Sequence, residues 1–357
     1  MLIEYWFDFS CPYAYLGSEL IEALAARCGA ELRWKPMLLG GVFRAIGNHE
    51  AGDAPGKRRH NYLDMHRWAD VRGIPFTMPA GHPMRTVAAL RALLSLPEDR
   101  WPAVIHGFYR AYWRRGLPPS EPSTIRTVLA QAGCDEAAIE RALAADEDAA
   151  IKDQLRARTD EAVARGVFGA PTLFVSGGDL AEPLMFWGQD RLHMVEAVLG
   201  GWRPGENVPP RSPRAEPARS DGAVVGPATT VHFWFDFSSP FSYLGATQIE
   251  AICARHGATL RWRPMLLGAL FKEVGAPNVP LLAMSESKRR YVGRENGYWA
   301  SWWQVPFTFT SHFPLRTVLP LRLVLAAGEQ PAPLIHALYR AAWVDNVDIG
   351  AEPGCAQ

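Results

Sequence analysis

The N-terminal part of the chain alternates between apolar runs of strand length and one segment with helical spacing. Leu2 to Phe9 is an apolar and aromatic run, which is typical of a buried strand. Pro12 fits the first turn of a helix, and Leu, Ile and Ala follow at helical spacing until Gly29. Ala30 to Lys35 alternates between apolar and polar residues and predicts a second strand. This order predicts a β-α-β unit.

Helical patterns dominate the following segment. His60 to Arg165 carries apolar residues at helical spacing, with prolines and a glycine between the periodic stretches. Two short strands are predicted after it, at Thr172 to Val175 and at Leu184 to Trp187. Asp190 is expected to N-cap a last helix that ends at Gly200. The order β-α-β, helical block, β-β-α predicts a thioredoxin-like α/β fold with a large α-helical insertion.

The same pattern starts a second time further along the chain. "IEYWFDFSCPYAYLG" at residues 3–17 recurs as "VHFWFDFSSPFSYLG" at residues 231–245. "LRWKPMLLGGVF" at residues 32–43 recurs as "LRWRPMLLGALF" at residues 260–271. The offset is 228 residues in both blocks, which is too long for a solenoid and indicates two homologous domains.

A proline-rich stretch separates the two copies. Residues 203–228 have mixed charges and no apolar periodicity, which is typical of an extended linker. We therefore predict a complete domain at residues 1–202 and a second, C-terminally incomplete domain at residues 229–357. The second copy has no counterpart of the first copy from about Pro122 onward. We expect its first strands to have an unpaired edge and the copy not to be an independent active site.

Composition narrows the classes of function. The 357 residues include 37 basic and 37 acidic side chains, which argues against a protein that grips nucleic acid over its whole surface. No apolar run approaches the ~18 residues of a membrane span, and we expect a cytoplasmic protein without a targeting leader. The 5 cysteines contain no C-x-x-C pair and the 10 histidines show no metal-ligand spacing, so no disulfide framework and no metal site are predicted.

Cys11 is the strongest candidate for chemistry because it lies between the first strand and the Pro-initiated helix. A helix N-terminus stabilises a thiolate by about 0.3–1 kcal/mol, up to about 2. At about 1.36 kcal/mol per pKa unit, a thiol pKa near 8.5 is expected to fall by about one unit or less. A small buried structural cysteine is the alternative. The position favours a functional thiol.

Four motifs in the first copy carry a resemblance to a known family. They are "FDFSCPYAYLG", "IGN", "GVFGAPT" and "WGQDRL". With them the first copy resembles the 2-hydroxychromene-2-carboxylate isomerases, relatives of the kappa-class glutathione transferases in the DsbA-like superfamily. The resemblance covers nearly all of residues 1–202. It implies a glutathione-dependent isomerase that acts on an aromatic carboxylic acid through reversible thiolate addition.

The resemblance also implies the residues of the site. Glutathione is expected to contact Cys11, Ala170, Pro171, Trp187, Gly188, Gln189 and Asp190. The small aromatic acid is expected to contact Lys35, Gly47, Asn48 and Arg85. A homodimer, or pairing of the two copies, is left open as the partner arrangement.

One departure from the family concerns the residue before the helix-starting proline. The family usually has serine there, whereas this chain has Cys11 in the first copy and Ser239 in the second; both are catalytic candidates. Ala14 stands where the DsbA oxidases carry a second cysteine, so a mixed disulfide expected at Cys11 could not be resolved within the domain. The alternatives are a monothiol oxidoreductase or a kappa-type glutathione transferase using Cys11, with the second copy as a non-catalytic binding domain.

Overall fold

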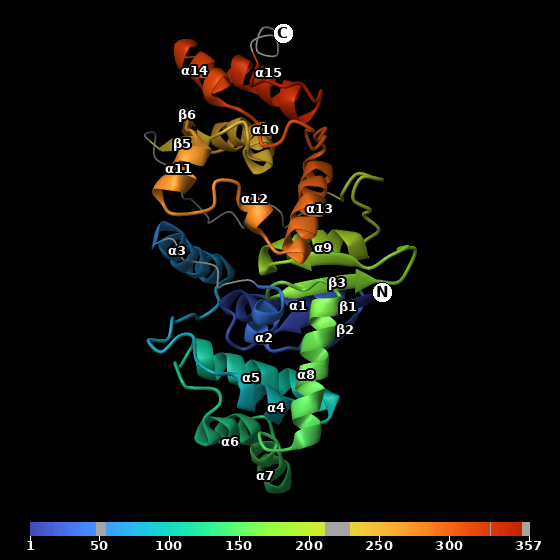
Figure 1. Cartoon of the computed structure of the whole chain (residues 1–357). Helices are drawn as coiled ribbons and strands as arrows, with labels where there is room; N and C mark the ends of the chain where they lie inside the picture. Colours follow the sequence, from blue (N-terminus) through green and yellow to red (C-terminus); the bar gives the residue numbers. More distant parts are fainter. Residues whose placement is uncertain (48–54, 211–228, 329, 352–357) are drawn as a thin grey trace. The chain divides into compact units, whose positions relative to one another are not determined.

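The structure is a computed structural model that describes residues 1–47, 55–210, 229–328 and 330–351 (Figure 1). The chain divides into two compact units, residues 1–201 with 285–288 and residues 202–284 with 289–357. Apart from residues 285–288, which belong to the second copy but cluster with the first unit, these units correspond to the two copies of the repeat. No helix in the described ranges combines the length and the apolar character that crossing a bilayer requires.

The first unit contains a four-stranded sheet in the order β2-β1-β3-β4. Its strands are β1 (Leu2–Phe7), β2 (Glu31–Pro36), β3 (Thr172–Ser176) and β4 (Leu184–Trp187). β1 pairs in parallel with β2 and antiparallel with β3, and β3 pairs antiparallel with β4. The predicted β-α-β start and the two later strands are confirmed, with ends shifted by one or two residues.

Helices cover this sheet and form the insertion. They are α1 (Pro12–Arg27), α2 (Leu39–Ala45), α3 (Pro55–Arg72), α4 (Val87–Leu94), η1 (Glu98–Arg100), α5 (Trp101–Trp113), α6 (Pro122–Gln131), α7 (Glu136–Ala144), α8 (Ala149–Ala164), η2 (Gln189–Arg191) and α9 (Leu192–Leu199), where η marks a 3₁₀ helix. α1 packs against α5 and α9. α6 and α7 lie at the end of the insertion away from the sheet, and α8 returns to the sheet, where it contacts β2 before the chain enters β3 (Figure 1).

Local signals explain where α1 begins and ends. Pro12 occupies the first turn, where its missing N–H would have no helical partner. At the other end Gly29 has a φ of 61°, a left-handed conformation that glycine adopts without strain. β1 is almost completely buried because it lies between two other strands and under helices, which accounts for its continuous apolar run.

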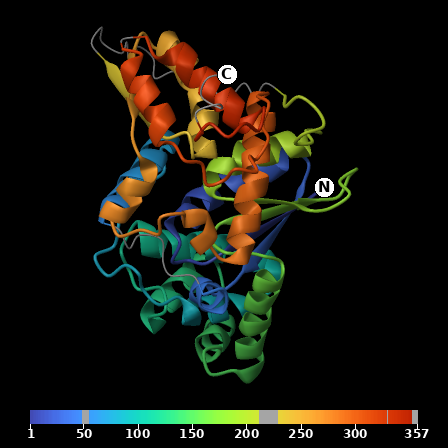
Figure 2. The ribbon, with the colours of Figure 1, turned by 45° about the horizontal axis from the view of Figure 1, so that its top comes forward.

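The second unit repeats the first part of this arrangement. Strands β5 (Thr230–Phe235) and β6 (Thr259–Pro264) form a parallel pair. The helices are α10 (Pro240–Arg255), α11 (Leu267–Glu273), α12 (Pro280–Ala283), α13 (Glu286–Trp303), α14 (Val318–Ala326) and α15 (Ala332–Trp343). α10 packs on both strands and against α15 (Figure 2).

The same buried hydrogen bonds recur in both units. Trp113 Nε1 donates to the carbonyl oxygen of Phe9 over 2.9 Å, and Trp343 Nε1 donates to that of Phe237 over 2.8 Å. All four side chains are fully buried. The repeat therefore preserves the packing of a long helix against the end of the first strand as well as the sequence motif.

The first residues of the predicted linker differ from the expected extended chain. The backbone N–H of Gly205 donates to Ser301 Oγ on α13 over 2.8 Å, and that of Arg203 donates to Asn207 Oδ1 over 2.7 Å. These bonds hold a turn directly after Trp202, whose side chain is 1% exposed. The rest of the predicted linker, residues 211–228, lies outside the described residues.

Candidate functional site

A buried aspartate holds the turn between β1 and α1. Asp8 is 1% exposed. Its Oδ1 accepts hydrogen bonds from the backbone N–H of Ser10 (3.0 Å) and from Thr86 Oγ1 (2.7 Å), and its Oδ2 accepts one from the backbone N–H of Leu39 (2.8 Å). Burial raises the pKa of Asp8, and the hydrogen bonds, which lower it, only partly offset this effect. The sequence prediction missed this residue, although "FDFS" in the first copy and Asp236 in the second were a signal.

This turn places Cys11 at the N-terminus of α1, where the sequence predicts it. The side chain of Cys11 is 7% exposed. Burial raises the pKa of Cys11 to about 12, although the backbone amides of Tyr13 and Ala14 lower it. The expected lowering of this pKa is therefore wrong, because loss of hydration disfavours the thiolate more than the helix N-terminus stabilises it. At neutral pH Cys11 is a protonated thiol.

The segment that enters β3 lies against this thiol. Cys11 Sγ donates a hydrogen bond to the carbonyl oxygen of Ala170 over 3.0 Å. The Ala170–Pro171 peptide bond is cis. The backbone N–H of Gly188 donates to the carbonyl oxygen of Pro171 over 2.9 Å. The structure thus brings together four predicted residues from three separate segments of the sequence.

The segment after β4 forms a tight turn. Gly188 has a φ of 103°, and a Cβ at this position would collide with Asp190 Oδ1. Trp187 packs against Phe168 with ring centroids 4.9 Å apart. The prediction that Asp190 N-caps the last helix is wrong, because η2 precedes α9 and Asp190 lies inside it. Its carboxylate pairs instead with Arg191.

Beside this turn lies a set of polar atoms with unmet hydrogen-bonding capacity. Gln189 is 1% exposed, and in the described part of the chain neither atom of its side-chain amide has a hydrogen-bond partner. Arg72 Nη2 donates to the carbonyl oxygen of Gln189 over 3.3 Å, while the enclosed Nη1 has no partner among the described residues. Burial lowers the pKa of Arg72 to about 10, and the charge of Asp190 raises it.

The sequence prediction missed Arg72, which lies at the end of α3 outside every motif. A comparison of the two copies could have pointed to Arg72. With Lys57 aligned to Lys288, Arg72 corresponds to Trp303, so arginine occurs only in the copy that also has the Trp-Gly-Gln-Asp segment. Basic side chains that are enclosed beside unpaired amides are suited to anionic ligands.

The structure describes three of the four residues that are predicted to contact the aromatic acid. Lys35 Nζ donates to Glu161 (2.9 Å), lies 3.7 Å from Glu4 and packs over the ring of Trp6, so its ammonium is engaged in a charge cluster. Gly47 is exposed and ends α2 with a φ of 63°. Arg85 is exposed directly before Thr86, which binds Asp8. Asn48 lies outside the described residues.

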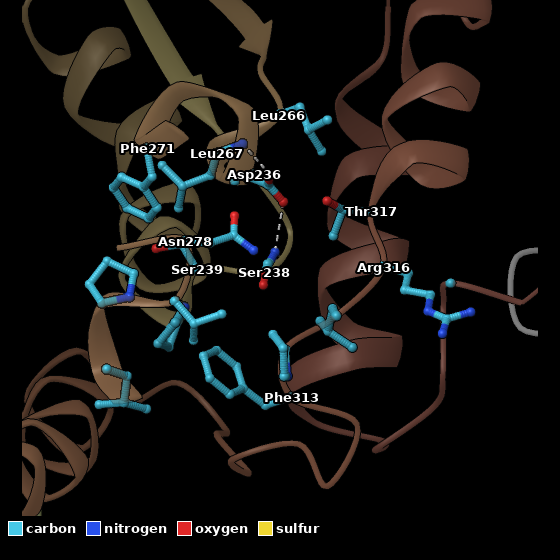
Figure 3. A pocket seen from close by; sticks show the side chains of 18 of the residues that line it. Asp236, Ser238, Ser239, Leu266, Leu267, Phe271, Asn278, Phe313, Arg316 and Thr317 are labelled. Atoms are coloured by element: carbon cyan, nitrogen blue, oxygen red, sulfur yellow. Dashed lines mark hydrogen bonds between the residues drawn. The ribbon is translucent and has the colours of Figure 1, made fainter. Parts of the chain in front are cut away.

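Ser239 occupies the position of Cys11 in the second unit. Its Oγ accepts a hydrogen bond from the backbone N–H of Ser242 over 3.2 Å and so caps α10. Ser239 also lines a cavity together with Asn278 and Arg316 (Figure 3). The second unit therefore places serine, asparagine and arginine around one space.

A sheet of this order, with a cis-proline facing the first helix N-terminus and a helical insertion, defines a thioredoxin-type protein. The chain belongs to the DSBA-like thioredoxin domain family, whose model matches residues 2–200 and 230–357. The family domain is thus present twice.

Curated relatives match about half of this chain and nearly all of their own length. A 2-hydroxychromene-2-carboxylate isomerase of Pseudomonas putida is 32% identical over 202 residues, covering 56% of this chain and 95% of the relative. Glutathione s-transferase kappa 2 of Caenorhabditis elegans is 27% identical, covering 56% and 91%. A solved structure of a 2-hydroxychromene-2-carboxylate isomerase is 31% identical and covers 56% of this chain and 95% of that chain, with a TM-score of 0.49.

Proposed function

We propose that the first unit is a glutathione-dependent isomerase of the 2-hydroxychromene-2-carboxylate isomerase type, which acts on an aromatic carboxylic acid. Relatives that match this unit carry the names of such isomerases and of kappa-class glutathione transferases. The relatives support an enzyme of this family. That the enzyme depends on glutathione and catalyses this isomerisation is our proposal.

The observation that carries the proposal is the set of unsatisfied polar atoms at Gln189 and Arg72. A buried polar group without a partner destabilises a protein by about 1–3 kcal/mol, so a ligand that pairs with it gains affinity. The γ-glutamyl end of glutathione carries a carboxylate that suits Arg72 and an ammonium that suits Asp190. Its peptide groups suit the backbone hydrogen-bonding groups of Ala170, which precedes the cis-proline at the start of β3.

Glutathione, when bound, supplies a thiolate that adds reversibly to a conjugated double bond, so that the bond can rotate before the thiolate leaves. The role of Cys11 is to stay protonated beside that sulfur. A neutral thiol does not repel a neighbouring thiolate, and its S–H can turn from Ala170 to the ligand as a weak donor. We assign the carboxylate of the aromatic acid to Arg85, because Lys35 is already paired with Glu161.

The alternative that the relatives favour is a kappa-type glutathione transferase. It needs the same glutathione site and an electrophilic aromatic substrate instead of an isomerisable one. A reaction in which Cys11 itself is the nucleophile has less support, because its thiol is buried and its pKa is raised to about 12.

The test combines activity with binding on the full chain. Purified protein is incubated with 2-hydroxychromene-2-carboxylate, with an aryl halide and with a glutathionylated peptide, each with and without glutathione. We expect turnover of the first compound only when glutathione is present. Turnover of the aryl halide alone would favour the transferase, and turnover of none would refute the proposal.

Gln189→Leu provides a sharper variant because it removes the unpaired amide without a large change in volume. We expect glutathione affinity to fall while thermal stability stays equal or rises, since an apolar side chain needs no partner. Gln131→Leu on the exposed surface of α6 is the matched control and should leave affinity unchanged. Loss of stability without loss of affinity would assign Gln189 a structural role.

A further inference from the structure

The second unit contains a cavity of about 760 Å³ between the N-terminus of α10, α11, α13 and the loop before α14. This volume lies within the ~300–1,000 Å³ that is typical of small-molecule sites. All the residues that line it belong to the second unit. Most of the lining is apolar and includes Phe241 and Phe309. Phe271 and Phe313 also belong to it (Figure 3).

One buried polar side chain at this cavity lacks a partner. Asn296 on α13 is fully buried, and among the described residues neither Oδ1 nor Nδ2 has a hydrogen-bond partner. Buried amides are almost always bonded, so an unbonded one points to a ligand that completes it. With Lys57 aligned to Lys288, the corresponding residue of the first copy is Met65. The amide is therefore a feature of the second copy alone and not a general requirement of the fold.

The charged groups at the cavity favour an anion. Arg316 and Arg322 line it, and both side chains are exposed. Asp236 also lines it, but its carboxylate already accepts hydrogen bonds from the backbone N–H groups of Ser238 (2.9 Å) and Leu267 (2.7 Å). In Figure 3 Arg316 lies at the margin of the cavity, with its guanidinium directed away from Ser238. A ligand in the cavity thus meets apolar walls, with cationic groups at the margin.

The features that suit glutathione in the first unit do not recur here. Trp303 stands where the first copy has Arg72. The described part of the second unit has no strand pair beside β5 that corresponds to β3 and β4. Ser239 caps its own helix, whereas Cys11 faces such a segment. Binding at this cavity therefore has no structural need for glutathione.

We propose that the cavity of the second unit is a glutathione-independent binding site for an apolar monocarboxylic acid that carries a hydroxyl or carbonyl group. Arg316 pairs with the carboxylate, the phenylalanine side chains enclose the apolar body, and Asn296 bonds the second polar group. This site lies in a different unit from the proposed isomerase and does not depend on that assignment.

The test is titration calorimetry on the full chain without glutathione. The probes are 3-hydroxy-2-naphthoic acid for a flat aromatic body and 12-hydroxydodecanoic acid for a chain, with 2-naphthol as the probe that lacks a carboxylate. We expect one molecule of at least one acid to bind per chain, more tightly than 2-naphthol. Comparison of the two affinities shows whether the site prefers a flat aromatic ligand or an aliphatic chain.

Variants locate the binding. Asn296→Met, which restores the residue of the first copy, should weaken acid binding by about tenfold or more, which is the effect of losing a buried hydrogen-bonding amide. Arg316→Met should weaken it by a similar factor and remove the preference over 2-naphthol. Arg294→Met is the matched control, because Arg294 is an exposed residue of α13, the helix that carries Asn296, and does not line the cavity. This variant should bind the acids as the wild type does.

Three outcomes would overturn the proposal: no binding of either acid, binding only when glutathione is added, or equal binding by wild type, Asn296→Met and Arg316→Met. If Asn296→Met does not fold, the exposed Arg316→Met decides alone. Isomerase activity should be unchanged in both variants, so failure here leaves the proposed function of the first unit standing.

Discussion

The two copies place different side chains at one structural position. Cys11 and Ser239 both precede the proline that begins a helix. Ser239 bonds the backbone N–H of its own helix, whereas Cys11 donates to Ala170, a residue 159 positions away. A helix N-terminus therefore does not set the chemistry of its first side chain. The segment packed opposite, which the structure describes only in the first unit, decides it.

The central strands show the same difference. Trp6 on β1 is fully buried, whereas Trp234 at the same place on β5 is 59% exposed. β1 lies between β2 and β3, while β5 pairs with β6 alone in the described residues. The equivalent sequence thus forms a core strand in one unit and an edge strand in the other. The repeated motif therefore determines how the first helix packs on the strand. Whether the tryptophan on that strand is buried depends on the rest of the fold.

The largest effect that we expect from this comparison concerns the two tryptophans. Trp6→Ala should destabilise the first unit by about 3–5 kcal/mol, because it removes a fully buried indole. Trp234→Ala should change the stability of the second unit by less than about 1 kcal/mol. Urea unfolding followed by limited proteolysis and mass spectrometry assigns each transition to its unit. Similar losses at both positions would mean that β5 is covered as β1 is.

Exchange of a residue between the copies tests the glutathione site. Arg72→Trp, which imports the residue of the second copy, should weaken glutathione binding by about tenfold or more, since charged hydrogen bonds contribute about 1.5–3 kcal/mol. Calorimetric titration measures this change. Arg67→Trp, on the exposed face of the same helix, should leave the affinity unaltered. An Arg72→Trp protein that binds normally would remove Arg72 from the site.

A smaller effect is expected at Cys11. Cys11→Ser should retain or raise isomerase activity, because a hydroxyl is a stronger donor than a thiol, while Cys11→Ala should lower it by roughly two- to tenfold, the range for one hydrogen bond. The buried thiol with a pKa near 12 should also gain no adduct from oxidised glutathione at neutral pH. Intact mass spectrometry reads this directly. An adduct on wild type that is absent from Cys11→Ser would restore the redox-sensitive cysteine that the sequence predicts.

The smallest effect concerns pH. Burial lowers the pKa of His106, but the neighbouring carboxylates of Glu19 and Glu22 outweigh this effect, so the net pKa is raised above 6.5. A raised histidine pKa contributes stability that is fully present below pH 6.5 and is lost as pH rises through the folded-state value. Thermal melts of wild type and His106→Gln should therefore differ most at pH 6 or below and converge at alkaline pH. A constant difference across pH would contradict this.

Much of the fold followed from local patterns. The apolar run at Leu2–Phe7, the proline at the start of α1 and the glycine after it predict the β-α-β unit, because these residues restrict the backbone wherever they occur. The repeat was visible for the same reason, since each copy keeps the motif in order. Its element order was enough to predict the thioredoxin-type fold.

Contacts between distant segments decided the rest. The pKa of Cys11 depends on burial that no neighbour in sequence causes, and Arg72 reaches Gln189 across 117 positions. Asp190 does not cap α9, because the 3₁₀ helix η2 contains Asp190 and runs directly into α9. Asn296 acquires an unpaired amide only where α13 closes on the cavity. Sequence by itself determined which elements form and that the first of them form twice. Only the packing of those elements determined which polar groups lose water, and these groups define the sites.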